Sequence, residues 1–100
     1  MFINNVLFLL AGSYTKQDIR DIINRTGWIC DIRWRRKDGV TTLHLNIGEN
    51  KTHFSYTLKD SIEPDEFYLE QYVLLAITEK EIISRQAESA FKILKSVTVI

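Results

Sequence analysis

The strongest constraint on this fold is a run of alternating apolar and polar residues that sets the register of neighbouring strands. Asp38 and Gly39 stand between two such runs. Asp-Gly favours a two-residue hairpin turn, because both central residues of a type I′ turn need a positive φ angle. A hairpin folded there pairs Trp34 with Leu43, Ile32 with Leu45 and Cys30 with Ile47 on one face, and Arg35 with Thr42, Arg33 with His44 and Asp31 with Asn46 on the other. A slip of one residue would exchange the two faces, so the register is well determined.

A second turn, at residues 48–51, returns the chain for a third strand. It pairs Leu45 with Phe54 and Leu43 with Tyr56 on the apolar face, and His44 with Ser55 and Asn46 with His53 on the polar face. Every pair again joins residues of the same character. The sequence therefore predicts a three-stranded antiparallel meander over residues 28–58, with one apolar and one polar side.

A strand and a short helix are expected before the meander. Residues 2–11 are apolar on both faces and predict a buried strand, although a helix is the alternative because periodicity cannot separate the two over so short a run. Thr15 and Asp18 are suited to cap a helix start, and Thr26-Gly27 is suited to end it. The inward face of this helix is formed by Ile19, Ile22 and Ile23.

One long helix is predicted after the meander, from the first-turn Pro64 to about Lys95. Its apolar seam alternates steps of four and three residues, the period of helix-on-helix packing, through Leu69, Val73, Ala76, Lys80, Ile83, Ala87, Ala90, Leu94 and Val97. About thirty helical residues span roughly 45 Å. A strand of eight residues covers only about 27 Å, so the second half of the helix would project beyond the sheet and need a partner.

Two alternatives stay open at the C-terminal end. Thr78-Glu79-Lys80-Glu81 is itself a capping box, so the helix could break there and fold back as two helices that cover the stripe internally. Residues 97–100 have the composition of a strand but could equally be a frayed end. The predicted fold is a single α+β domain over residues 1–100, in the order β-α-β-β-β-α, with the meander packed by a short helix and a long C-terminal helix.

Composition narrows the function classes. The chain has 100 residues, 45% of them hydrophobic and 26% charged, with no formal net charge, which argues against a dedicated nucleic-acid binder. The single cysteine, Cys30, cannot form an internal disulfide and points inward, which fits a reducing compartment. No Lys or Arg precedes the short apolar run at residues 6–11, and no stretch approaches the roughly 20 apolar residues of a membrane span. We expect a cytoplasmic protein without membrane contact.

The polar side of the meander carries the candidate chemistry. Arg33, Arg35, Arg36 and Lys37 lie near the hairpin tip and could bind phosphate or carboxylate groups. His44 and His53 occupy adjacent strands on the same face, so a small ribonuclease that uses them as an acid–base pair is a minor alternative. Two histidines on a polar face are ordinary, and Cys30 faces the other way. We therefore expect no enzymatic activity, no metal and no cofactor.

The leading hypothesis is a non-enzymatic protein–protein interaction module: an inhibitor, an adaptor or a regulatory subunit. Its apolar stripe would bind an identical chain, giving a homodimer, or a foreign protein, and the basic hairpin would orient the partner. A nucleic-acid-binding regulator that uses the basic hairpin is the alternative. Compact neutral chains of this kind are common in phages and mobile elements, which adds that origin as an expectation. The predicted partner-binding residues are Ile83, Ala87, Ala90, Phe91, Leu94, Arg33, Arg35, Arg36, Lys37 and His44.

Overall fold

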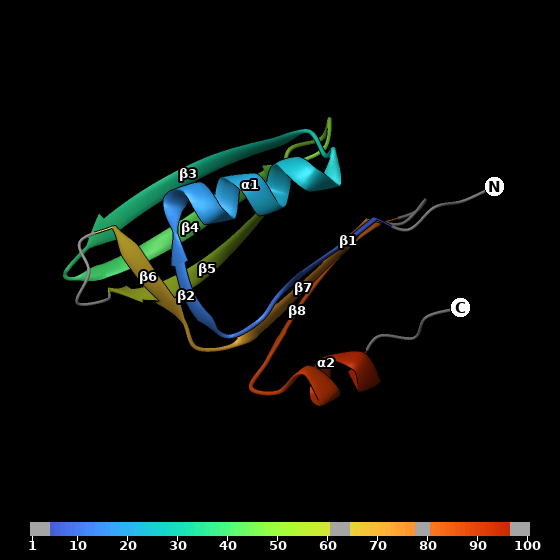
Figure 1. Ribbon diagram of the computed structural model, residues 1–100. Coiled ribbons are helices and arrows are strands. Elements are labelled where there is room, and N and C mark those ends of the chain that lie inside the picture. The colour runs from blue at the N-terminus through green and yellow to red at the C-terminus, as the bar shows by residue number, and fades with distance from the viewer. Residues whose placement is uncertain (1–4, 61–64, 78–80, 97–100) are drawn as a thin grey trace.

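A computed structural model describes residues 5–60, 65–77 and 81–96 of the chain (Figure 1). It is mostly β structure, with two antiparallel sheets and few helices. The elements are β1 (Asn5–Leu9), β2 (Gly12–Thr15), α1 (Lys16–Thr26), β3 (Cys30–Lys37), β4 (Val40–Ile47), β5 (Thr52–Asp60), β6 (Glu66–Leu69), β7 (Tyr72–Ile77), β8 (Ile82–Ala87) and α2 (Ala90–Ser96). The broad α+β class is confirmed, but the predicted element order is not.

The meander has the predicted register. β3 pairs with β4 and β4 pairs with β5 in each of the residue pairs that the alternation of the sequence indicates. Asp38 and Gly39 have φ angles of 53° and 76°, as a type I′ turn requires. The prediction succeeds because a turn of known length fixes the register. A shift of one residue would also place the apolar side chains on the solvent face.

The N-terminal part is also close to expectation. Residues 5–9 form a strand, which settles the choice between strand and helix at that segment. The Thr15 hydroxyl accepts a hydrogen bond from the Asp18 amide, and the Asp18 carboxylate accepts one from the Thr15 amide, so the two residues form a capping box for α1. Gly27 ends the helix in the left-handed conformation, with φ 75°. The second strand, β2, was not predicted, because Gly12-Ser13 resembles a break.

The prediction of a long C-terminal helix is wrong. Glu66–Leu69, Tyr72–Ile77 and Ile82–Ala87 form the strands β6, β7 and β8, and of the described residues after Asp65 only Ala90–Ser96 is helical. The error has a physical cause: both faces of β7 are covered, so its sequence is a continuous apolar run without a period of two. The predicted break at Thr78-Glu79-Lys80-Glu81 lies outside the described residues except for Glu81, and the predicted terminal strand at 97–100 lies entirely outside them.

The two sheets share a bent two-stranded ribbon. The strand order is β1-β7-β8 in one sheet and β2-β6-β5-β4-β3 in the other. Because β1 leads directly into β2 and β6 directly into β7, the paired strands pass from one sheet to the other and bend near Leu10 and Glu70. Figure 1 shows this ribbon, with α1 on one side and α2 on the other.

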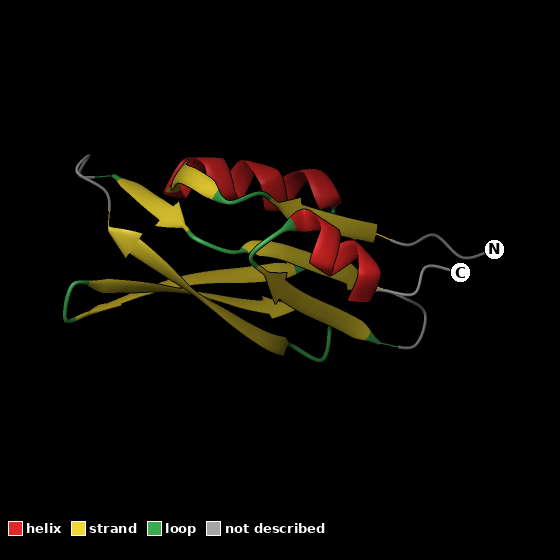
Figure 2. Ribbon diagram, turned by 90° about the horizontal axis from the view of Figure 1, so that it is seen from below, coloured by secondary structure: helices red, strands yellow, loops and turns green. Residues whose placement is uncertain are grey.

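The core lies on both sides of β7. Val73 and Leu75 belong to the main cluster, together with Ile19 and Ile23 of α1 and the inner face of the meander. The alternate residues Leu74 and Ala76 belong to a smaller cluster under α2, which centres on the fully buried Ile93. No described helix lies on the outer face of the meander, so its polar side is uncovered (Figure 2).

Candidate functional site

The outer face of the meander holds two neighbouring hollows. The first, here called the cationic hollow, has a volume of about 600 Å³ and is lined by Arg33, Trp34, Arg35, His44 and His53. The second, the polar cleft, has a volume of about 550 Å³ and is lined by Ser55, Thr57, Lys59, Glu70, Gln71, Gln86 and Glu88. Both volumes lie within the range of ligand sites in proteins.

The two histidines of the cationic hollow, His44 and His53, stack and form a hydrogen bond with each other. They sit on a diagonal of the β4–β5 ladder, since His44 is opposite Ser55 and His53 is opposite Asn46. Their rings stack with centroids 5.2 Å apart, and Nδ1 of His44 lies 2.9 Å from Nε2 of His53. The remaining nitrogen of His44, Nε2, is buried and has no hydrogen-bond partner among the described residues.

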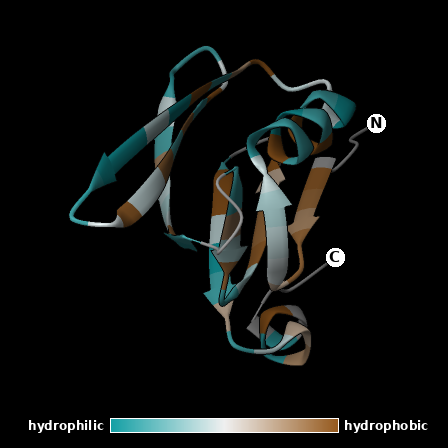
Figure 3. Cartoon of the chain, turned by 60° about the vertical axis from the view of Figure 1, so that its left-hand side comes forward, coloured by the Kyte–Doolittle hydropathy of each residue, from teal (hydrophilic) through white to brown (hydrophobic). Residues whose placement is uncertain are grey.

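The predicted basic cluster is divided between the two faces of β3. Arg33 and Arg35 are exposed and line the cationic hollow, where their guanidinium groups suit a carboxylate or phosphate. Arg36 instead forms an ion pair of 2.6 Å with Asp60, which also accepts a hydrogen bond from the buried Thr41. Lys37 is exposed at the hydrophilic hairpin tip (Figure 3). The structure therefore joins Arg33, Arg35 and His44 and separates Arg36 from them.

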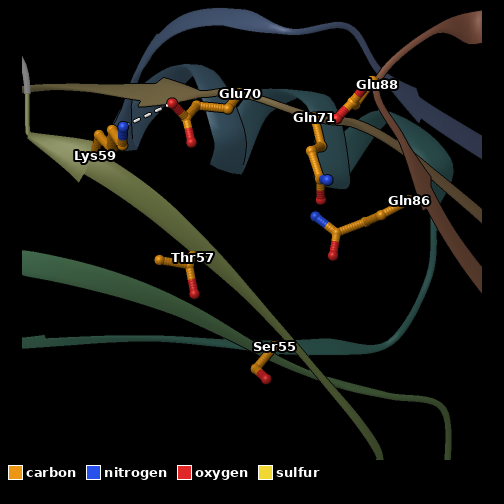
Figure 4. Close-up of a pocket in the computed structure, with 7 residues that line it drawn as sticks. All are labelled: Ser55, Thr57, Lys59, Glu70, Gln71, Gln86 and Glu88. Atoms are coloured by element: carbon orange, nitrogen blue, oxygen red, sulfur yellow. Dashed lines mark ion pairs between the residues drawn. The ribbon is translucent and has the colours of Figure 1, made fainter.

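The polar cleft lies between β5 on one side and the β6–β7 bend and the end of β8 on the other. Its amide groups come from Gln71, at the β6–β7 bend, and Gln86, on β8, and they point into the same space beside Ser55 and Thr57 (Figure 4). Lys59 forms an ion pair of 2.7 Å with Glu70 at one end. The hydrogen bond to Glu70 raises the pKa of the exposed Lys59 amine.

A partly buried hydrogen bond joins the two strands that border this cleft, β5 and β8. The Tyr56 hydroxyl, on the core side of β5, lies 2.7 Å from the hydroxyl of Ser84 on β8. Burial raises the pKa of Tyr56 to about 12, while the hydrogen bond to Ser84 acts in the opposite direction. Gly48, in the β4–β5 turn, also lies near Ile82 at the start of β8. β8 is thus held in place facing β5, although the two strands are not paired.

The predicted apolar stripe does not form one surface. Ile83 and Ala87 are half-buried on β8, and Ala87 packs on the small cluster under α2. Ala90 begins α2, and Phe91 is 66% exposed, with the amine of Lys95 5.0 Å from its ring centroid. The side chain of Leu94 lies outside the described part of the structure. The pattern missed Ile93, which lies on α2 and is fully buried.

The polar cleft could not be found from the sequence. Its walls at Glu70, Gln71, Gln86 and Glu88 depend on β6, β7 and β8, which the helix prediction replaced. The cationic hollow was within reach, since the β3–β4–β5 register already placed four of its residues on one face: Arg33, Arg35, His44 and His53.

Comparison with protein-family models, with curated proteins and with solved structures gave no match. In the described residues, no three or more His, Cys, Asp or Glu side chains are grouped as a metal ion would need. Neither described helix has the length and apolar character that crossing a membrane requires.

Proposed function

We propose that this protein is a non-enzymatic protein-binding module that acts through the outer face of the meander. The observation that carries the proposal is that two hollows of different charge adjoin on this face. His44 lines the cationic hollow and is paired across the ladder with Ser55, which lines the polar cleft. Adjacent strands are about 4.8 Å apart, so one partner can contact both hollows.

The charge pattern favours a protein over a nucleic acid. Arg33 and Arg35 would attract a phosphate chain, but the neighbouring cleft holds Glu88, whose charge is not balanced within the cleft and would repel the continuation of that chain. The zero net charge of the chain also gives no long-range attraction to a polyanion. A protein surface can present acidic and basic groups side by side and so match both hollows.

The histidine pair does not favour catalysis. An acid–base pair that acts on one phosphate must hold the reacting atoms between its two nitrogens. Here the facing nitrogens of His44 and His53 contact each other, and the second nitrogen of His44 is buried. These contacts support a binding role for the pair, in which the rings fix each other and shape the hollow.

A second copy of the chain is not part of the proposal. The homodimer was expected from an apolar stripe that projects from a long helix, but its residues are divided between β8, which holds Ile83 and Ala87, and α2, which begins at Ala90. The proposed partner is a different protein, and the module would serve as its inhibitor, adaptor or regulatory subunit.

Site-specific photo-crosslinking tests this function. A photoreactive residue at position 55, between the two hollows, should give a covalent adduct with one protein of the native host. The same residue at Asn24, exposed on α1 and away from this face, should give none. The double variant Arg33→Glu, Arg35→Glu should abolish the adduct without changing the thermal unfolding midpoint. Equal adducts at positions 55 and 24 would contradict the proposal.

The nucleic-acid alternative has its own test. Fluorescence anisotropy with labelled DNA and RNA at low salt should show no binding by the wild-type protein. Binding that weakens steeply as salt rises, and that the Arg33→Glu, Arg35→Glu variant loses, would establish the alternative in its place.

A further inference from the structure

We propose that the polar cleft accepts an extended peptide segment of a partner protein, which adds as a strand to the unpaired edge of β5. This inference rests on the proposed protein-binding function and names the form of the bound partner. Strand addition to a sheet edge is a general mode of peptide recognition, in which backbone hydrogen bonds supply affinity and side-chain contacts supply specificity.

The register shows which peptide groups of β5 are free. The hairpin at Asp38-Gly39 has a two-residue loop, so Lys37 and Val40 form a hydrogen-bonded pair. The Gly48 amide donates to the Ile29 carbonyl, which continues the same alternation along the ladder. Even-numbered residues of β4 therefore bond to β3, and odd-numbered residues bond to β5.

The same alternation applied to β5 leaves three peptide groups without a partner among the described strands. Its even-numbered residues bond to β4, because each is opposite an odd-numbered residue of that strand. The peptide groups of His53, Ser55 and Thr57 consequently point to the other edge. β6 pairs with β5 only at Lys59 and Asp60, so no described strand pairs with these three residues on that side. They span about 14 Å of strand.

This free edge borders the polar cleft. Ser55 and Thr57 line the cleft with their side chains, and Gln71 and Gln86 face them from the opposite wall (Figure 4). Primary amides donate and accept hydrogen bonds, so the wall can also bond to a peptide backbone. The Tyr56–Ser84 hydrogen bond holds β8 beside the cleft, which protects the edge from indiscriminate pairing.

Charge defines the peptide further. Three charged residues line the cleft: Lys59, Glu70 and Glu88. Lys59 is paired with Glu70, which leaves the negative charge of Glu88 uncompensated within the cleft. A bound peptide should therefore carry Lys or Arg at the position that faces Glu88, within an otherwise polar, strand-forming sequence.

The test begins with a library of random linear heptapeptides displayed on phage and selected on the whole protein. A synthetic peptide of the selected sequence is then titrated into ¹⁵N-labelled protein. We expect a basic consensus, the largest amide shifts at Ser55, Thr57, Gln71 and Gln86, and slower hydrogen exchange at Ser55 and Thr57 in the bound state.

Two substitutions at one position separate backbone pairing from side-chain contact. Thr57→Pro removes the free N–H without removing a bond to β4, and proline is tolerated at such an edge position. It should weaken peptide binding by about tenfold or more, while Thr57→Val, which keeps the N–H, should stay within about threefold of the wild type. If Thr57→Pro does not fold, the exchange of the Ser55 and Thr57 amides in the wild-type complex decides the question.

The outcomes distinguish this inference from the function beneath it. Selection of no binding peptide, or equal loss in Thr57→Pro and Thr57→Val with no protection of the edge amides, overturns strand addition. Selection of acidic peptides that shift the amide signals of Arg33, Arg35 and His44 instead would also overturn strand addition. That outcome would leave the proposed protein-binding function standing. Failure of the position-55 crosslink removes the function itself.

Discussion

At the scale of single residues, the hydrogen bond between His44 and His53 determines which nitrogen of each neutral ring carries hydrogen. The buried Nε2 of His44 has no partner among the described residues. A buried N–H without an acceptor is rarer in proteins than a buried acceptor without a donor. The favoured arrangement therefore has the Nδ1–H of His44 donating to Nε2 of His53, and leaves Nε2 of His44 without hydrogen.

This arrangement predicts a measurable tautomer. Long-range ¹⁵N–¹H correlation spectra should identify His44 as the Nδ1–H form when both rings are neutral. His53→Ala removes the acceptor and should shift both ring nitrogens of His44, whereas Asn46→Ala, on the same face, should leave them nearly unchanged. A wild-type His44 with hydrogen on Nε2 would contradict the assignment.

Tyr56 makes stability depend on pH in the alkaline range. Burial raises its pKa to about 12 in the folded protein, from the ordinary tyrosine value of about 10. Between these values the folded state holds a proton that the unfolded state releases, so the free energy of unfolding falls as pH rises from about 10 to 12. Urea unfolding across this range should show the decline, and Tyr56→Phe should make it shallower. An equally steep decline in Tyr56→Phe would contradict this role.

At the scale of elements, α1 depends on its capping box. Thr15→Ala removes the hydroxyl that accepts from the Asp18 amide at 3.0 Å, and should lower the free energy of unfolding by about 1 kcal/mol. Thr15→Ser keeps the hydroxyl and is the matched control. Urea unfolding of both variants provides the measurement, and equal stability of the Ala and Ser variants would show that the cap contributes nothing.

Truncating a large side chain on either face of β7 should destabilise the protein. Leu75 packs in the main core and Leu74 under α2, so Leu75→Ala and Leu74→Ala should each cost about 2–5 kcal/mol. Leu74→Ala should in addition speed hydrogen exchange in α2, because Leu74 belongs to the apolar cluster on which that helix packs. A nearly neutral Leu74→Ala would mean that α2 does not cover this face.

The difference between β5 and β7 explains how far sequence could predict this fold. Along β3, β4 and β5 one face contacts solvent, so apolar and polar residues alternate in the sequence. This alternation predicts the register of each strand pair. Along β7 both faces are dry, and the run from Tyr72 to Ile77 has no period that would separate strand from helix. The absence of Gly and Pro between Pro64 and Lys95 then favours a helix. The apolar seam predicted along that helix is therefore not formed.

At the scale of the whole molecule, the same limit applies to the candidate site. The cationic hollow is formed within the meander, and Arg33, Arg35 and His44 were predicted to share its face. The polar cleft joins β5 to residues that follow β6 and β8, up to 31 positions beyond Thr57 at Glu88. Such contacts arise from the bent ribbon, which carries no local sequence signal.

Peptide binding by strand addition requires an open edge on β5, and hydrogen exchange in the free protein measures whether that edge is open. Exchange followed by ¹H–¹⁵N spectra should alternate along the strand: the amides of Phe54, Tyr56 and Leu58 protected by β4, and those of His53, Ser55 and Thr57 exchanging much faster. That alternation would show an edge available to a peptide strand. Uniform protection from His53 to Leu58 would mean that the edge is already paired, and would contradict the account.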